Sequence, residues 1–357
     1  MKSFANVRRA LRFLLPAVAA AMLALPARAE EKSLLTPDGI LYHVQAGLYK
    51  AFEPSGTSAA PDDYVIRWDS RSQAGEVLSG IIPGTDSPSV KDQFDIAYDA
   101  LSQSLFLVWN DRVSMINSVQ FAVYQRGIWT QSQLLPSGVF SFANHPQILI
   151  THQTMQELDA QGAEIDTPRS VISVIWWEAS AKPHARFAPL FLENGSIDLS
   201  TIQIYDLPEL VGSSSVVVST VLQNPLYRNP AIQQDGFSAG IVAAFGDAAS
   251  GNLQVVRIGF PSDFRGSADP LGGRHSIVIL GQNSLPMPSS VPASPTRLGA
   301  IVGGGYQPTV YWQPDDGSVN YSVAANGSWS DVRSVALTSS LGADAALALI
   351  SQMATQN

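Results

Sequence analysis

The chain has 357 residues, of which 21 are basic and 30 acidic, a formal net charge of −9 and no cysteine. The lack of cysteine excludes disulfide bonds and attachment of lipid through a cysteine. The acidic balance makes nucleic acid and anionic lipid poor partners, because such a surface repels phosphate groups.

Residues 1–29 have the pattern of an export signal. The first 12 residues hold four basic side chains, residues 13–25 are apolar but too few to span a membrane, and Ala27-Arg28-Ala29 is a small-residue cleavage site. We therefore expect cleavage after Ala29, a secreted or periplasmic protein with no membrane insertion after cleavage, and one domain over residues 30–357. Five of the 21 basic residues lie in the signal, so 16 remain against 30 acidic residues, a net charge of −14.

Short apolar segments separated by Asp, Asn, Gly and Pro follow the signal. Most of them end in an aromatic residue with an acid or amide close behind it. Five such segments cover residues 64–69, 105–111, 171–178, 241–247 and 309–312. Their almost continuous apolar character is typical of strands that are buried on both faces.

Four segments that begin with Pro or Phe after a polar residue are candidates for the innermost strands of successive sheets. They cover residues 93–97, 144–148, 229–232 and 307–310. We expect each to be an innermost strand, or its start, with a hairpin leading outward from it.

Two segments 200 residues apart repeat one design. Residues 121–130 (FAVYQRGIWT) and 321–330 (YSVAANGSWS) each indicate an alternating strand, a turn with Gly at its tight position, and a Trp that opens the next strand. Each follows a strand that ends in Trp and a polar tail, at Trp109 and Trp312. A strand–turn–strand unit of roughly 45 residues is typical of a radial array of β-sheets.

The sequence therefore predicts an all-β fold, a β-propeller of five to seven blades with six favoured, and one short C-terminal helix over residues 341–353. The apolar strands with Trp plus acid, and the Gly-x-Trp-Ser/Thr endings, resemble the sialidase-like or BNR-type β-propeller superfamily. Asn326-Gly327-Ser328-Trp329 keeps only the tail of the Asp-box of true sialidases, Ser-x-Asp-x-Gly-x-Thr-Trp. The resemblance implies the fold, and such folds host many functions.

A serine hydrolase motif also occurs. Gly236-Phe237-Ser238-Ala239-Gly240 matches G-x-S-x-G, and Asp263 and His275 follow in the chain order of an α/β-hydrolase triad. The motif needs an apolar strand directly before it, whereas residues 231–235 are mostly polar. We therefore interpret Asp235-Gly236 as a turn between two strands.

The strand ends supply the candidate binding residues, because equivalent strand ends of a propeller gather on one face. These candidates are Trp68, Asp69, Trp109, Asp111, Arg112, Trp177, Glu178 and Asp247. The alternative is that the tryptophans fill the layers between blades and the acids sit in turns. No catalytic residue is assigned. We expect no cofactor and no metal, because the five histidines lack the spacing of a metal site.

Two functional hypotheses follow from these residues. The first is a non-catalytic binding or scaffold module whose ligand is a carbohydrate or a protein, because the repeat comes without an intact catalytic motif. The second is a sialidase-like glycoside hydrolase or lyase, in which two strand-end carboxylates flank the bond to be cleaved. The oligomeric state is not legible in the sequence.

Overall fold

The computed structural model describes five antiparallel sheets that follow one another along the chain. The described residues are 31–48, 63–113, 116–135, 143–178, 184–193, 196–209, 218–223, 237–247, 252–261, 277–286, 288–290, 297–302, 308–313, 318–325 and 328–336. The expected signal (1–29) and C-terminal helix (341–353) lie outside them. Within these ranges no helix has the length and apolar character that a membrane crossing requires.

Each sheet is built from strands in chain order, with hairpin neighbours paired. The first sheet contains β1 (Glu31–Leu35), β2 (Leu41–Leu48), β3 (Tyr64–Arg71) and β4 (Val77–Ile81). The second contains β5 (Phe94–Asp99), β6 (Ser104–Val113), β7 (Ile116–Gln125), β8 (Ile128–Trp129) and β9 (Gln133–Leu134). The third contains β10 (Ala143–Leu158), β11 (Glu164–Glu178), β12 (His184–Glu193), β13 (Ser196–Ile197) and β14 (Tyr205–Glu209).

The last two sheets follow the same plan. The fourth contains β15 (Val218–Gln223), β16 (Phe237–Asp247), β17 (Asn252–Pro261) and β18 (Val278–Pro286). The fifth contains β19 (Arg297–Val302), β20 (Pro308–Gln313), β21 (Ser318–Ala325), β22 (Ser328–Trp329) and β23 (Arg333–Ala336). A short 3₁₀ turn at Leu199–Thr201 lies between β13 and β14.

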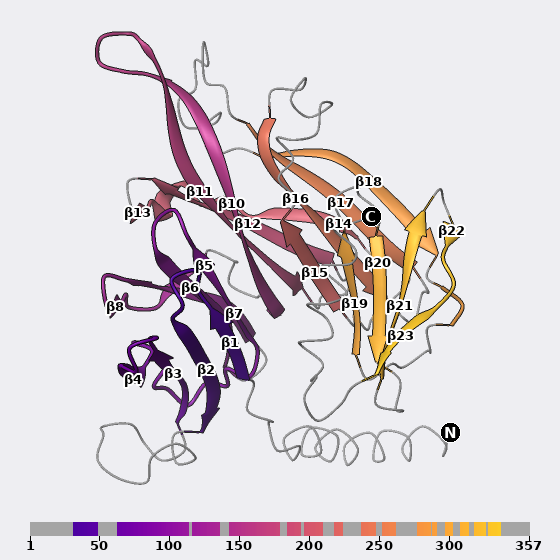
Figure 1. Cartoon of the computed structure of the whole chain (residues 1–357), viewed down its shortest axis with the longest axis horizontal. Coiled ribbons are helices and arrows are strands. Elements are labelled where there is room, and N and C mark those ends of the chain that lie inside the picture. The colour runs from indigo at the N-terminus through magenta and orange to yellow at the C-terminus, as the bar shows by residue number, and fades with distance from the viewer. Residues whose placement is uncertain are drawn as a thin grey trace, which may run out of the picture.

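The first strands of consecutive sheets contact one another, β1 with β5, β5 with β10, β10 with β15, and β15 with β19. Figure 1 shows the sheets in chain order from indigo to yellow, and the long β10–β11 hairpin extending beyond the rest of its sheet. Inner strands packed side by side, with hairpins leading outward, define a β-propeller. The predicted all-β propeller is thereby confirmed. The predicted range of five to seven blades, six favoured, stays a prediction, and the described residues contain five sheets.

The expected innermost strands are correct in the second and third sheets, where β5 and β10 begin near Phe94 and Ala143. The expected segment at residues 229–232 lies outside the described residues, in which β15 is the first strand of the fourth sheet. The expectation is wrong in the fifth sheet, where β19 is the first strand and Pro308 opens the second strand, β20. A proline lacks the N–H of a ladder bond, so it marks the start of a strand without saying which strand it starts.

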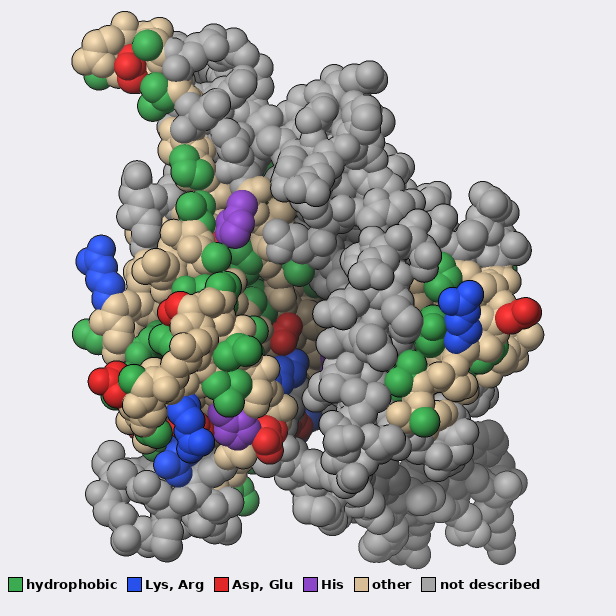
Figure 2. Space-filling view, in the orientation of Figure 1, with side chains coloured by type: hydrophobic (Ala, Val, Ile, Leu, Met, Phe, Trp, Pro, Cys, Tyr) green, Lys and Arg blue, Asp and Glu red, His purple; other side chains and the backbone are tan. Residues whose placement is uncertain are grey.

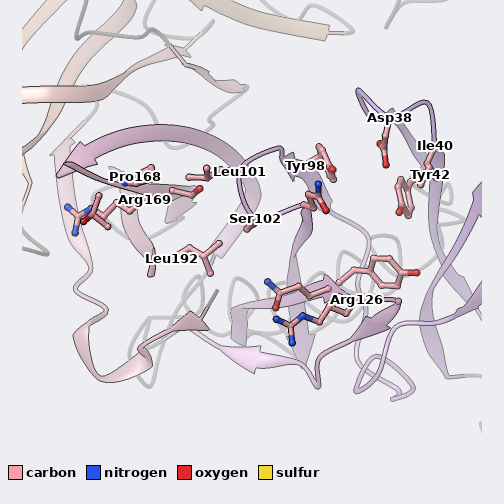
Figure 3. Close-up of a pocket in the computed structure, with 16 residues that line it drawn as sticks. Asp38, Ile40, Tyr42, Tyr98, Leu101, Ser102, Arg126, Pro168, Arg169 and Leu192 are labelled. Carbon is pink, nitrogen blue, oxygen red and sulfur yellow. The ribbon is translucent and has the colours of Figure 1, made fainter. Parts of the chain in front are cut away.

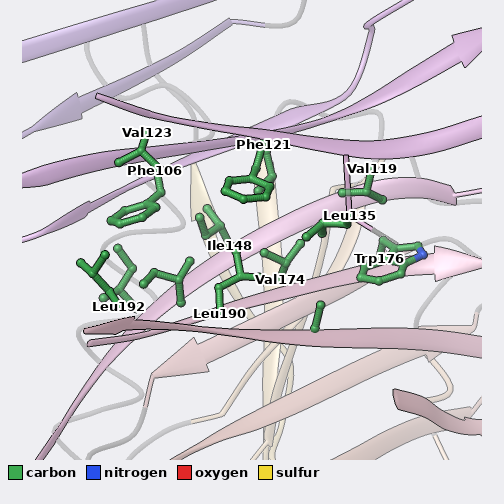
Figure 4. Packing of buried hydrophobic residues seen from close by; sticks show 14 of the residues in the cluster. Phe106, Val119, Phe121, Val123, Leu135, Ile148, Val174, Trp176, Leu190 and Leu192 are labelled. Atoms are coloured by element: carbon green, nitrogen blue, oxygen red, sulfur yellow. The ribbon is translucent and has the colours of Figure 1, made fainter. Parts of the chain in front are cut away.

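The core lies between consecutive sheets, and strand alternation explains it. Along β6, Phe106 and Val108 face the third sheet, whereas Leu105, Leu107 and Trp109 face the first. Figure 4 shows the layer between the second and third sheets. A third cluster joins the third sheet to the fourth. Because successive residues of a strand point to opposite faces, an inner strand between two layers must be apolar at every position.

The face of the molecule seen in Figure 2 carries acidic and basic side chains scattered over its described part, without a large patch of either sign. A basic stripe of the kind that binds nucleic acid is not seen on this described part of the surface.

Candidate functional site

A pocket of about 810 Å³ lies between the first three sheets. Its walls come from the β1–β2 turn, the β5–β6 turn, the β7–β8 turn and the inner part of β11. Figure 3 shows Asp38, Tyr42 and Tyr98 near one another, and Arg169 and Pro168 at the opposite end. Seven of the 16 lining residues belong to turns between strands, and turns on a rigid scaffold are where binding residues are usually found.

The β1–β2 turn holds Asp38 in a fixed place. The backbone N–H of Gly39 donates to the Thr36 carbonyl at 2.9 Å, and the backbone N–H of Ile40 donates to Oγ1 of Thr36 at 3.1 Å. Pro37 occupies the second position of the turn, where its fixed φ is favourable, and Gly39 has a φ of 81°. Asp38 therefore projects from a turn that two hydrogen bonds to Thr36 hold in place.

The β7–β8 turn places Arg126 at the edge of the pocket. Gln125 and Ile128 pair directly, so Arg126 and Gly127 form a two-residue hairpin loop. Both have positive φ values, 53° and 84°. Glycine adopts this conformation readily, whereas an arginine is strained in it, and strain of this kind concentrates at functional sites.

Three tyrosines from three strands line the pocket. The rings of Tyr42 and Tyr124 are 6.0 Å apart at an angle of 69°. Tyr124 also packs on Trp68 and Trp129, at 5.0 and 5.3 Å between ring centroids. Tyr98 is half-buried and packs against the same cluster. The result is an aromatic wall whose rings are fixed from behind by two tryptophans.

The polar ends of these tyrosines have no protein partner. The hydroxyls of Tyr42, Tyr98 and Tyr124 line the pocket, and none of them is hydrogen-bonded to another residue of the described chain. The Asp38 carboxylate, also in the lining, has no hydrogen bond or ion pair with the residues described. Burial, followed by the charges of Tyr124, Asp38 and Tyr98, raises the pKa of Tyr42 to about 12, so its hydroxyl is a neutral donor at physiological pH.

A buried carboxylate with several donors lies beneath the floor of the pocket. Asp99 accepts hydrogen bonds from Nε2 of His152 and from the hydroxyl of Ser170, both at 2.7 Å, and from the backbone N–H groups of Leu101 and Ser102. Burial opposes the ionisation of Asp99, but the hydrogen bonds from His152, Ser102 and Ser170 outweigh it and lower the pKa to about 2. The same contact raises the pKa of His152. Since both serines line the pocket, this network fixes two wall positions.

Arg169 forms the far end of the pocket. Its guanidinium carbon lies 4.4 Å from the centre of the Phe191 ring, and the residue is only 2% exposed. A guanidinium stacked on an aromatic face is held in one orientation. Arg169 is therefore a rigid part of the wall.

None of the eight candidates from the strand ends lines this pocket. Trp68 lies directly behind it, in contact with Tyr124, and Trp109 is fully buried in the same cluster. Trp177 lies in the separate cluster between the third and fourth sheets. These three tryptophans thus fill layers between sheets, which is the alternative interpretation of the candidate tryptophans.

The charged candidates are distributed over four sheets. Asp69 is half-buried in β3, and Asp247 is the last residue of β16. Asp111 lies 3.8 Å from the ammonium of Lys91, and Arg112 pairs with Asp92 at 2.9 Å. Glu178 is buried, 3.7 Å from Arg186. A binding role for these side chains stays a prediction.

The serine hydrolase motif does not form a strand-to-helix turn. Ser238 lies inside β16, at an irregularity in its pairing with β17. Asp235, Gly236, Asp263 and His275 lie outside the described residues. Within the described part of the chain, the motif is a stretch of strand.

Sequence reasoning missed Asp38, Tyr42, Tyr98, Tyr124, Arg126, Asp99, His152 and Arg169. A local signal existed for Arg126, which stands before Gly127 at a position where Asn or Gly is preferred. The others have no such signal, because turns of three sheets come together only in the folded chain.

No family model matches the chain, and no curated protein matches it. Among solved structures, the Aleuria aurantia lectin in complex with Fucα1-6GlcNAc shares 14% identity at a TM-score of 0.42, over 87% of this chain and 79% of that one. AofleA from Arthrobotrys oligospora shares 13% at 0.42, over 88% and 74%. NanB sialidase from Streptococcus pneumoniae shares 8% at 0.30, over 80% and 65%. Likenesses this weak assign neither a family nor a ligand, so the pocket itself has to indicate the function.

Proposed function

We propose that this protein is a carbohydrate-binding β-propeller module, and that the pocket between its first three sheets is the binding site. One observation supports the proposal most strongly. Three tyrosine hydroxyls and one carboxylate face the same pocket without a partner among the described residues. Groups of this kind stay unpaired at little cost only where water or a ligand reaches them.

The chemistry of the wall suits a sugar. A sugar ring offers C–H groups on its faces and hydroxyls around its edge. Tyrosine rings take the C–H faces, while hydroxyls and carboxylates bond to the edge. A volume of about 810 Å³ also lies within the usual range for small-molecule sites, about 300–1,000 Å³.

The same wall argues for binding without catalysis. A glycoside hydrolase needs a carboxylic acid that stays protonated, with its pKa raised, beside a second carboxylate. Asp38 is the one carboxylic acid among the described lining residues, and Asp99 beneath the floor has a pKa of about 2. The described pocket lining therefore lacks the pair of carboxyl groups that such a hydrolase needs.

Export and a single domain over residues 30–357 belong to the same proposal. The sequence of residues 1–29 supports export, and secretion would place the module where extracellular sugars occur. Expression with the natural N-terminus, followed by N-terminal sequencing of the exported protein, tests this part. Sequencing should begin at Glu30, and a cytoplasmic, uncleaved chain would contradict it.

A glycan array followed by calorimetry tests the binding function. The wild-type protein should bind at least one oligosaccharide, and Tyr98→Ala should weaken that binding by roughly tenfold, because the ring and its hydroxyl are both lost. Tyr205→Ala is the matched control, since Tyr205 is a half-buried tyrosine of the third sheet outside the pocket lining. No binding on the array, or equal weakening by both variants, would contradict the proposed site.

A further inference from the structure

One end of the pocket has the composition of an aromatic cage. Tyr42 from β2, Tyr98 from β5 and Tyr124 from β7 meet there, and Asp38 projects beside them from the β1–β2 turn. The rings of Tyr42 and Tyr124 are in edge-to-face contact, at 69° to each other, and both residues are largely buried. We use the name aromatic cage for these four residues.

The aromatic cage has a negative electrostatic character. The pKa of Tyr98 is raised by burial first and then by the charges of Asp38 and Asp99, and Asp38 also acts on Tyr42. The faces of the three rings add to this field, because the face of an aromatic ring carries negative charge.

Asp38 and Asp99 differ in how their charges are balanced. Asp99 is fully buried and surrounded by donors from two strands and a turn. Asp38 is exposed and has no donor among the residues described. The charge of Asp38 is therefore available to a ligand, and the net charge of −9 on the whole chain favours a cationic ligand over an anionic one.

We infer that the sugar bound here carries an ammonium group, as a 2-amino-2-deoxyhexose does, and that the aromatic cage recognises this group. The inference rests on the proposed function. An ammonium over tyrosine faces gains cation–π attraction, and Asp38 supplies the counter-charge. The pocket extends beyond the cage to Ser102 and Gln103, which leaves room and polar partners for the rest of the sugar.

Three tetrasaccharides with one backbone test the inference. The β-1,4-linked tetramers of glucosamine, N-acetylglucosamine and glucose differ only at C2, which carries an ammonium, an acetamide or a hydroxyl. Calorimetry at pH 5.5 keeps the amine protonated. We expect the glucosamine tetramer to bind roughly tenfold more tightly than the glucose tetramer.

Variants of the aromatic cage should remove this preference. Asp38→Asn keeps the shape and removes the charge, so the ratio of the two affinities should fall to about one. Glu76→Gln is the matched control, because it removes one exposed carboxylate from the same sheet, outside the pocket lining. Tyr98→Phe should keep most of the preference and Tyr98→Leu should lose it. A thermal melt of each variant verifies that it is folded.

The outcomes separate the inference from the proposed function. Equal binding of the three tetramers, or binding of other array sugars but not of the glucosamine tetramer, overturns the inference and leaves the sugar-binding function standing. Binding of choline without binding of the glucosamine tetramer also overturns it, since the cage would then recognise an ammonium that is not on a sugar. Failure of every sugar overturns both.

Discussion

The two hairpins at residues 121–130 and 321–330 have the same strand register and different surroundings. In both hairpins, the hydroxyl of the residue after the Trp accepts a hydrogen bond from the backbone of the preceding strand. Oγ1 of Thr130 accepts from the Val123 N–H at 3.0 Å, and Oγ of Ser330 accepts from the Val323 N–H at 3.1 Å. Only the first hairpin lines the pocket. It contributes residues 124–127 to the lining, and at the positions of Tyr124 and Arg126 the second hairpin has alanine and asparagine.

This difference separates residues that specify the fold from residues that specify the site. The Trp, the Gly and the hydroxyl after the Trp recur because the hairpin needs them. Tyr124 and Arg126 do not recur, and Arg126 replaces the asparagine that suits a turn with positive φ. Arg126 fits its turn less well than an asparagine would, and it lies in the hairpin that borders the pocket. This combination indicates that Arg126 has a role in the pocket.

The largest expected difference between the hairpins concerns their tryptophans. Trp129 is 6% exposed within the core, whereas Trp329 is half-exposed and donates its indole N–H to the Pro286 carbonyl at 2.6 Å. Trp129→Ala should lower the free energy of unfolding by about 3–5 kcal/mol, and Trp329→Ala by about half as much. Urea titrations measure both. Trp129→Phe, which keeps a ring in the core, should cost much less than Trp129→Ala. Equal losses of unfolding free energy for Trp129→Ala and Trp329→Ala would contradict the expected difference between the two hairpins.

The floor beneath the first hairpin should make stability depend on pH. The pKa of Asp99 is lowered to about 2, so its contribution, about 2 kcal/mol, is present above pH 4 and is lost as the pH falls through 2. The pKa of His152 is raised, so its contribution is present below pH 6.5 and is lost as the pH rises through the raised value. Unfolding at a series of pH values should therefore show a maximum between about pH 4 and 6.5. Asp99→Asn should flatten both slopes, and a variant as pH-dependent as the wild type would speak against this network.

The hydroxyls of Thr130 and Ser330 should contribute equally to the free energy of unfolding. Thr130→Val and Ser330→Ala each leave a backbone N–H without its hydroxyl acceptor, and each should cost about 1 kcal/mol. Chemical denaturation of the two variants measures this. If the two losses of unfolding free energy differ by more than about 1 kcal/mol, the same hydrogen-bond geometry does not contribute the same free energy in the two hairpins.

The smallest effect concerns the strained turn. Arg126→Asn should stabilise the protein by about 0.5 kcal/mol, because asparagine adopts a positive φ more easily. Gly127→Ala is the opposing control, since a Cβ there meets no atom within 4 Å and the expected loss, about 1 kcal/mol, comes from the backbone alone. Thermal melts resolve both shifts. Destabilisation by Arg126→Asn would mean that Arg126 stabilises the fold rather than the site.

The sequence was sufficient for the features that repeat locally. Continuous apolar runs at residues 105–111 and 171–178 indicated strands between two layers. The strand pairs of both hairpins and the Gly turn of the first are confirmed, whereas residues 326–327 of the second lie outside the described residues. It was insufficient for sheet membership, because a Pro or Phe opening does not distinguish an inner strand from its neighbour. This is why residues 307–310 were interpreted as the innermost strand of the fifth sheet, which is β19.

The pocket could not be predicted for a different reason. Asp38, Tyr98 and Arg126 lie in or beside turns of different sheets, and each segment taken alone indicates only a turn. The strand ends, from which a site was expected, mostly have partners of their own, such as Lys91 for Asp111 and Arg186 for Glu178. Unpartnered polar groups become visible only when all neighbours are known.

Hydrogen exchange of the backbone amides, with and without the tetrasaccharide that binds most tightly, tests the central claim most directly, because both hairpins are observed in one experiment. We predict slower exchange on binding at residues 36–42, 98–103 and 124–128, and no change at 318–330. Equal protection of both hairpins, or protection confined to the second, would contradict a single sugar-binding site between the first three sheets.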